Sequence, residues 1–97
     1  MQRPLCERDI AAYLIKKATA LGGIARKVAW EGRANAPDYL IMCNGTHAFI
    51  ETKAPGRKAR PNQMREFEAM RVHGGATVHV VSTFAEVDAL FSELFHT

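Results

Sequence analysis

The chain has 97 residues, a hydrophobic fraction of 47% and a net charge of +3. That length accommodates one domain with one core, covering residues 1–97, and that composition excludes wholesale disorder. There is no apolar run of about 18 residues and no signal-peptide pattern, so we expect no membrane partner and an intracellular location. Neither cysteine lies in a CxxC pair and the histidines lack zinc-ligand spacing, which argues against a zinc site.

Positive charge is concentrated in the middle of the chain. Residues 53–71 contain six basic and two acidic side chains, whereas residues 84–97 contain three acidic side chains and no lysine or arginine. This asymmetry favours a phosphate-bearing polymer as the partner over a small neutral ligand.

The N-terminal segment predicts an amphipathic helix over residues 5–21, which follows Pro4 and ends at Gly22-Gly23. Helical spacing from Ile10 places Glu7 on the apolar side, where a carboxylate needs a partner or a metal ion. An alternative is a solvated carboxylate at a helix N-terminus, where the helix dipole favours negative charge.

The next segment predicts a strand over residues 24–30, a loop over 31–37 and a hairpin with strands 38–43 and 46–53. Asn44-Gly45 between the two strands is typical of a type I′ turn, which requires positive φ at both central residues. The following stretch, residues 54–60, is a basic loop whose proline and glycine end the strand.

The C-terminal part predicts a helix from Pro61 to Gly74, a strand over 77–82 buried on both faces, and a last helix introduced by a Thr83–Glu86 capping box. Gln63 shares the inward face of its helix with Phe67. The element order is therefore α-β-β-β-α-β-α, an α/β fold with a mixed central sheet flanked by helices.

The hairpin register places two carboxylates opposite each other. If Asn44-Gly45 forms the turn, Cys43 faces Thr46, and counting back in pairs sets Asp38 against Glu51, with Cβ atoms roughly 5 Å apart. Because like charges in that position destabilise a sheet, a divalent metal ion between them is expected.

These residues predict a site for phosphodiester hydrolysis, which needs a Lewis acid, a nucleophile and cations on the phosphate. Carboxylate ligands suit Mg²⁺ or Mn²⁺, and Lys53, on the same face as Glu51, would act on water and phosphate. The expected metal ligands are Asp38, Glu51, the main-chain carbonyl of Thr52 and, directly or through water, Glu7. The expected contacts with backbone phosphates are Arg57, Lys58 and Arg60.

Pro37-Asp38 followed by Glu51-Thr52-Lys53 resembles the PD-(D/E)xK nuclease signature. With Gln63 on the next helix and Glu7 on the first, nearly the whole chain is similar to the VRR-NUC (virus-type replication-repair nuclease) family and to its stand-alone, phage-like members. The resemblance implies a restriction-endonuclease-like fold and an active site that comprises Glu7, Asp38, Glu51, Lys53 and Gln63.

The resemblance also implies a function. The family cleaves DNA with a divalent metal ion, and its stand-alone members are associated with homodimers that act on branched DNA. We therefore expect a structure-specific endonuclease that acts on branched DNA such as four-way (Holliday) junctions, in the cytoplasm of a phage-infected bacterium.

Simpler interpretations remain open at this point. Asp38 could be an ordinary turn residue, Gln63 could only cap backbone groups, and the basic loop could be a solvated turn. The alternative functions are a non-catalytic DNA-binding module on a nuclease-like fold, a less structure-selective DNase or restriction-like endonuclease, and an RNA-cutting relative.

Overall fold

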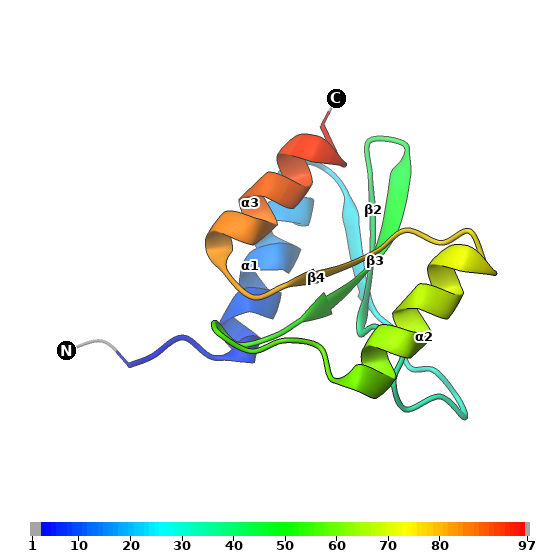
Figure 1. Cartoon of the computed structure of the whole chain (residues 1–97). Coiled ribbons are helices and arrows are strands. Elements are labelled where there is room, and N and C mark those ends of the chain that lie inside the picture. Colours follow the sequence, from blue (N-terminus) through cyan, green and yellow to red (C-terminus); the bar gives the residue numbers. More distant parts are fainter. Residues whose placement is uncertain (1–2, 97) are drawn as a thin grey trace.

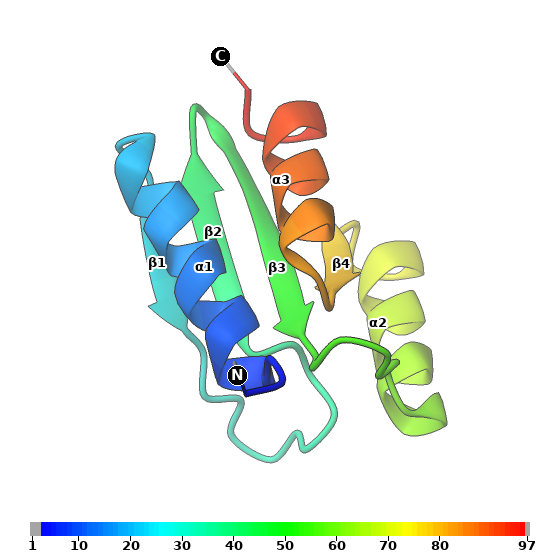
Figure 2. The ribbon, with the colours of Figure 1, turned by 90° about the vertical axis from the view of Figure 1, so that its left-hand side faces the viewer.

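The computed structural model describes residues 3–96, which form a four-stranded sheet with helices on both of its faces (Figures 1 and 2). In chain order the elements are α1 (Glu7–Ala20), β1 (Ile24–Lys27), β2 (Tyr39–Cys43), β3 (Thr46–Thr52), α2 (Pro61–Val72), β4 (Val78–Val81) and α3 (Phe84–Glu93). This order is the predicted one, and the α/β fold class is confirmed. Within residues 3–96, no helix is both long and apolar enough to cross a membrane.

The sheet has the spatial order β1-β2-β3-β4. β1, β2 and β3 are antiparallel neighbours, and β4 runs parallel to β3 after the crossover through α2. The hairpin turn is the predicted one, because Asn44 and Gly45 have φ angles of 51° and 80°. The turn fixes the register at Cys43 opposite Thr46.

The core lies between one face of the sheet and the pair α1 and α3. Its sheet residues include Ile41 and Ile50, both fully buried. The apolar face of α3 packs into this same core, where Val87, Phe91 and Phe95 are buried. The chain's own core therefore covers most of the apolar face of α3.

α2 lies on the opposite side of the sheet, beside β4 (Figure 2). It buries only Gln63 and Phe67. β4 is an edge strand with one buried valine on each of its faces, Val78 and Val81. The prediction of burial on both faces is confirmed for these two residues, whereas His79 is exposed and Val80 is half-buried.

The outer edge of β4 is occupied by charged side chains. The Lys53 N–H donates to the Val81 carbonyl, so Val81 faces β3, and strand alternation turns the backbone of Val78 and Ser82 outward. Arg71 donates to the Val78 carbonyl from Nε at 3.1 Å and from Nη2 at 2.8 Å. The Glu86 carboxylate accepts the Ser82 N–H at 2.8 Å.

The end of β1 differs from the sequence-based prediction for a local reason. β1 ends at Lys27 rather than at residue 30, because the Trp30 ring turns to pack on Phe49 and its Nε1 donates to the Pro37 carbonyl at 2.7 Å. In the predicted capping box, Thr83 Oγ1 accepts the Glu86 N–H, and the Glu86 carboxylate also accepts hydrogen bonds from the N–H and the hydroxyl of Ser82.

Candidate active site

The two predicted carboxylates lie where the hairpin register places them. Tyr39 pairs with Ile50, so the next position sets Asp38, one residue before β2, against Glu51 on β3. The backbone of Asp38 is held by β1, since its carbonyl accepts the Val28 N–H at 2.7 Å.

Glu7 joins these two residues from the N-terminus of α1. One carboxylate oxygen each from Glu7, Asp38 and Glu51 lies within 4.8 Å of the others. Their burial differs, because Glu7 is exposed, Asp38 is half-buried and Glu51 is 2% exposed. The prediction that Glu7 points inward was therefore wrong about burial, because Glu7 is the first residue of its helix and lies beyond the packed turns.

Glu51 has two donors on one oxygen and none on the other. Lys53 Nζ lies 3.2 Å from Glu51 Oε2, and Gln63 Nε2 donates to the same oxygen at 3.1 Å. Glu51 Oε1 is buried and has no hydrogen-bond partner among the described residues. Burial and the nearby Asp38 carboxylate raise the pKa of Glu51, although Lys53 and Gln63 act in the opposite direction.

Gln63 contacts both the backbone at the start of its helix and the Glu51 carboxylate. Its Oε1 accepts the Arg60 N–H at 3.0 Å at the start of α2, which is a helix-capping contact. The cap fixes the orientation of the amide, so its NH₂ group points to Glu51. Gln63 is 4% exposed, and its amide therefore couples the position of α2 to that of the carboxylate.

The register also explains why a proline precedes Asp38. The backbone groups of odd-numbered residues along β3 point toward β4, and the N–H of Lys53, directly after the strand, still donates to Val81. The carbonyl of the even-numbered Thr52 therefore points the other way, toward β2. Extending the β2–β3 register places Pro37 opposite Thr52, and proline has no N–H to donate. The Thr52 carbonyl is thereby left without its ladder donor, beside Asp38 and Glu51.

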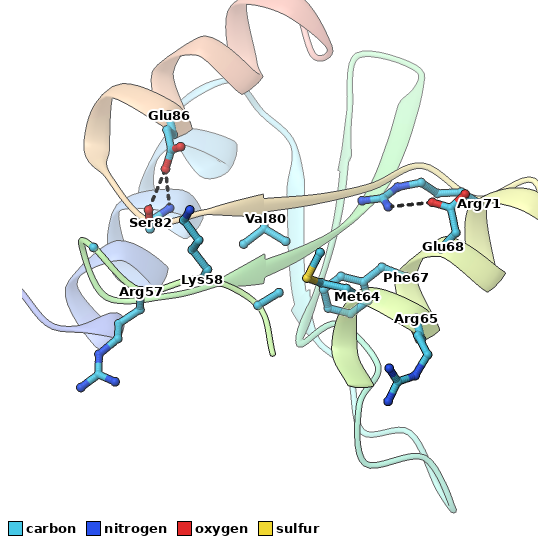
Figure 3. A pocket seen from close by; sticks show the side chains of 12 residues that line it. Arg57, Lys58, Met64, Arg65, Phe67, Glu68, Arg71, Val80, Ser82 and Glu86 are labelled. Atoms are coloured by element: carbon cyan, nitrogen blue, oxygen red, sulfur yellow. Dashed lines mark hydrogen bonds and ion pairs between the residues drawn. The ribbon is translucent and has the colours of Figure 1, made fainter. Parts of the chain in front are cut away.

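The basic loop leads from β3 to α2 and exposes all three predicted phosphate ligands, Arg57, Lys58 and Arg60. Arg57 and Lys58 do not join the acidic cluster but line a neighbouring groove (Figure 3). The sequence did not indicate this groove, because its other wall is α2 and its floor is β4, whose register to β3 follows from the crossover.

The acidic cluster fits a hard divalent cation. Its donors are all oxygen atoms, and one of them, Glu51 Oε1, is buried without a hydrogen-bond partner in the described part of the chain. A buried carboxylate oxygen in that state is costly unless a cation satisfies it. A small set of carboxylates together with a main-chain carbonyl, here that of Thr52, matches the way proteins bind Mg²⁺ and Mn²⁺.

Comparison with known proteins agrees with this geometry. No family model matches the sequence. A relative named "Putative nuclease p44", from Acyrthosiphon pisum secondary endosymbiont phage 1, is 42% identical over 65 residues, which are 66% of this chain and 70% of the relative. A solved structure described as a "VRR_NUC domain" has a TM-score of 0.79 and 39% identity, covering 90% of this chain and 95% of its own. The chain therefore belongs to the VRR-NUC family of nucleases.

Proposed function

We propose that the protein is a divalent-metal-dependent, structure-specific DNA endonuclease that acts on branched DNA such as four-way junctions. The observation that carries the proposal is the unpartnered oxygen of buried Glu51, beside Lys53 and within the cluster formed with Glu7 and Asp38. The phage origin of the relative supports a role in the cytoplasm of a phage-infected bacterium.

Each site residue has a proposed role. Asp38, Glu51 and the Thr52 carbonyl would hold Mg²⁺ or Mn²⁺, with Glu7 as a direct or water-mediated ligand. When bound, the ion would supply Lewis-acid stabilisation of the phosphate and a lowered pKa for water. Lys53 would orient the attacking water and stabilise charge on the phosphate oxygens, and Gln63 would keep Glu51 in place.

Cleavage assays test this function directly. Matched four-way junctions, flaps, nicked duplexes and linear duplexes are incubated with Mg²⁺, Mn²⁺ or a chelator. We expect cleavage only with a metal ion, and faster cleavage of branched DNA. Tight DNA binding without cleavage under every condition would instead identify a non-catalytic DNA-binding module.

The basic loop should contribute phosphate contacts. Replacing Arg57, Lys58 and Arg60 with glutamine should weaken duplex binding and reduce its salt dependence by up to about 0.9 log units per lost contact. Binding isotherms at several salt concentrations measure the slope, and Lys16→Gln on α1 is the control, since Lys16 is exposed outside the loop. An unchanged slope in the triple variant would place the DNA elsewhere.

A homodimer is proposed because a junction must be nicked symmetrically on two strands, and a two-fold dimer supplies two sites at a fixed separation. The sheet face turned away from α1 and α3 is a candidate interface. Ile41 and Ile50 point into the core, so their neighbours Leu40, Met42 and Phe49 point to this second face. There they join Ile24, the register partner of Met42, in an apolar strip: Ile24, Leu40, Met42 and Phe49.

We expect light scattering at micromolar concentration to give about twice the chain mass of 10.8 kDa. Ile24→Glu should shift the protein to monomer and convert paired junction cuts to single nicks. Ile15→Glu is the matched control, because Ile15 is similarly exposed, at 39% against 42% for Ile24, but lies on α1. A wild-type monomer that cuts linear duplex as well as junctions would contradict this prediction.

A further inference from the structure

A groove of about 700 Å³ lies beside the acidic cluster, between the basic loop, α2 and the outer face of β4 (Figure 3). Val80 lies between the two walls, with Met64 and Phe67 on one side and Lys58 on the other. The volume is in the range of sites that hold a small organic ligand or part of one.

The apolar part of the groove exposes one large side chain. Phe67 is 1% exposed and supports the wall from behind, whereas Met64 is 58% exposed. A flexible thioether makes favourable contacts with the faces and edges of aromatic rings. Met64 and half-buried Val80 thus offer a surface suited to a flat aromatic group.

The charged part of the groove is available to an anion. The side chains of Arg57 and Lys58 have no hydrogen-bond or ion-pair partner among residues 3–96. The two acidic residues of the lining are already engaged, Glu68 with Arg71 and Glu86 with Ser82. An occupant with both a flat ring and phosphate groups would match the two parts together.

Two residues that line the groove are direct neighbours of proposed catalytic residues. Val80 is the register partner of Glu51 on the adjacent strand, so their side chains share one face of the sheet. Met64 directly follows Gln63 on α2. A nucleic acid strand whose phosphate lies at Glu51 and Lys53 would therefore place its neighbouring nucleotide over Val80.

We propose that this groove binds an unpaired nucleotide next to the scissile phosphate, with its base against Met64 and Val80 and its backbone phosphates on Arg57 and Lys58. A base inside a duplex presents only its edge, because its faces are stacked, so the groove selects branched DNA with an unpaired nucleotide, such as a flap or a four-way junction whose central base pair has opened. This inference rests on the proposed nuclease function and specifies the part of a branched substrate that the chain recognises.

Binding without cleavage tests the contact with the base. Fluorescence anisotropy, with all divalent metal chelated, compares a labelled oligothymidylate of about eight nucleotides with the same backbone carrying abasic sites. Loss of the bases should weaken wild-type binding about fivefold or more. A fivefold change in affinity corresponds to the lower end of the stacking free energy of a single base. In Met64→Ala most of this difference should disappear, because the side chain that the base contacts is absent.

Val72→Ala is the matched control, since Val72 is also on α2 and is 64% exposed but does not line the groove. It should retain the wild-type difference. If base removal weakens the wild type and Met64→Ala equally, or weakens neither, the groove does not hold a base and the inference is wrong. If Met64→Ala leaves DNA binding unchanged and instead alters the mass in light scattering, the groove is a protein contact, which also overturns the inference.

Cleavage separates this inference from the function on which it rests. With Mg²⁺ or Mn²⁺, Met64→Ala should lower the ratio of flap cleavage to linear-duplex cleavage at least about fivefold, in line with the lost base contact. An unchanged ratio in an active Met64→Ala enzyme overturns only the groove. A wild-type protein that cleaves no DNA with either metal ion overturns the nuclease function and, with it, the inference.

Discussion

Replacing Asp38 with alanine should lower DNA cleavage by about 10³-fold or more while the metal-free protein stays folded. The loss is large because Asp38 is one of two carboxylates proposed to hold the ion, and several kcal/mol of transition-state stabilisation correspond to such a factor. The fold should survive because Asp38 precedes β2 and its backbone, not its side chain, bonds β1. Single-turnover cleavage and thermal melting measure the two effects.

Metal-free stability provides a second readout for the same site. Burial and Asp38 raise the pKa of Glu51, so ionising Glu51 costs stability as pH rises through that pKa. Asp38→Asn removes the neighbouring charge and keeps the shape of the side chain. In chelator at neutral pH and above, this variant should melt at or above the wild-type temperature.

Adding Mn²⁺ should raise the wild-type melting temperature, because an ion that binds only the folded state stabilises it, and should raise that of Asp38→Asn much less. Glu93→Gln, which removes an exposed carboxylate at the end of α3, should behave as wild type in both assays. Near wild-type cleavage by Asp38→Ala would remove the acidic cluster from the mechanism.

Lys53→Met should lose most of the cleavage rate, about 10²- to 10⁴-fold, while retaining Mn²⁺ affinity. Lys53 is 8% exposed and its Nζ lies 3.2 Å from Glu51, so methionine keeps the packing of the stem and removes only the charge. The rate should fall because that charge acts on water and phosphate rather than on the ion.

Calorimetric titration with Mn²⁺ and single-turnover cleavage at saturating metal distinguish the roles of Lys53. Lys58→Met is the comparison, because Lys58 is exposed in the basic loop and should affect DNA binding more than the rate of the bound complex. A large loss of metal affinity in Lys53→Met, with a normal rate once the metal is saturating, would assign Lys53 a structural role.

Local signals in the sequence predicted the fold well. Asn44-Gly45 fixed a register in which Asp38 faces Glu51, because a two-residue turn leaves one pairing between its strands. Proline marked the start of α2 because its ring fixes φ, and glycine marked the ends of α1 and α2 because it readily adopts positive φ, as Gly22 and Gly75 do. The proposed active-site residues that depend on this hairpin could therefore be predicted from the sequence.

Features that depend on packing between distant segments could not be predicted from the sequence. The burial of Glu7 was misjudged, since helical periodicity gives a direction but not how far the helix end extends past the sheet. The sequence also does not show that α1 and α3 share one core, so the extent to which the apolar face of α3 is covered could not be predicted. The groove at Val80 requires the parallel register of β3 and β4, which no local pattern encodes.

The charged contacts along β4 have a consequence for behaviour in concentrated solution. An open strand edge is a template on which another chain can add a strand, and such addition can continue into fibres. Arg71 at Val78 and Glu86 at Ser82 occupy the outward backbone groups on either side of Val80, leaving too short a stretch for a new strand to pair. The opposite edge, β1, is four residues long and ends in Arg26-Lys27. Both edges of the sheet thus discourage strand addition, and the homodimer proposed above would have to form through a face of the sheet rather than through an edge.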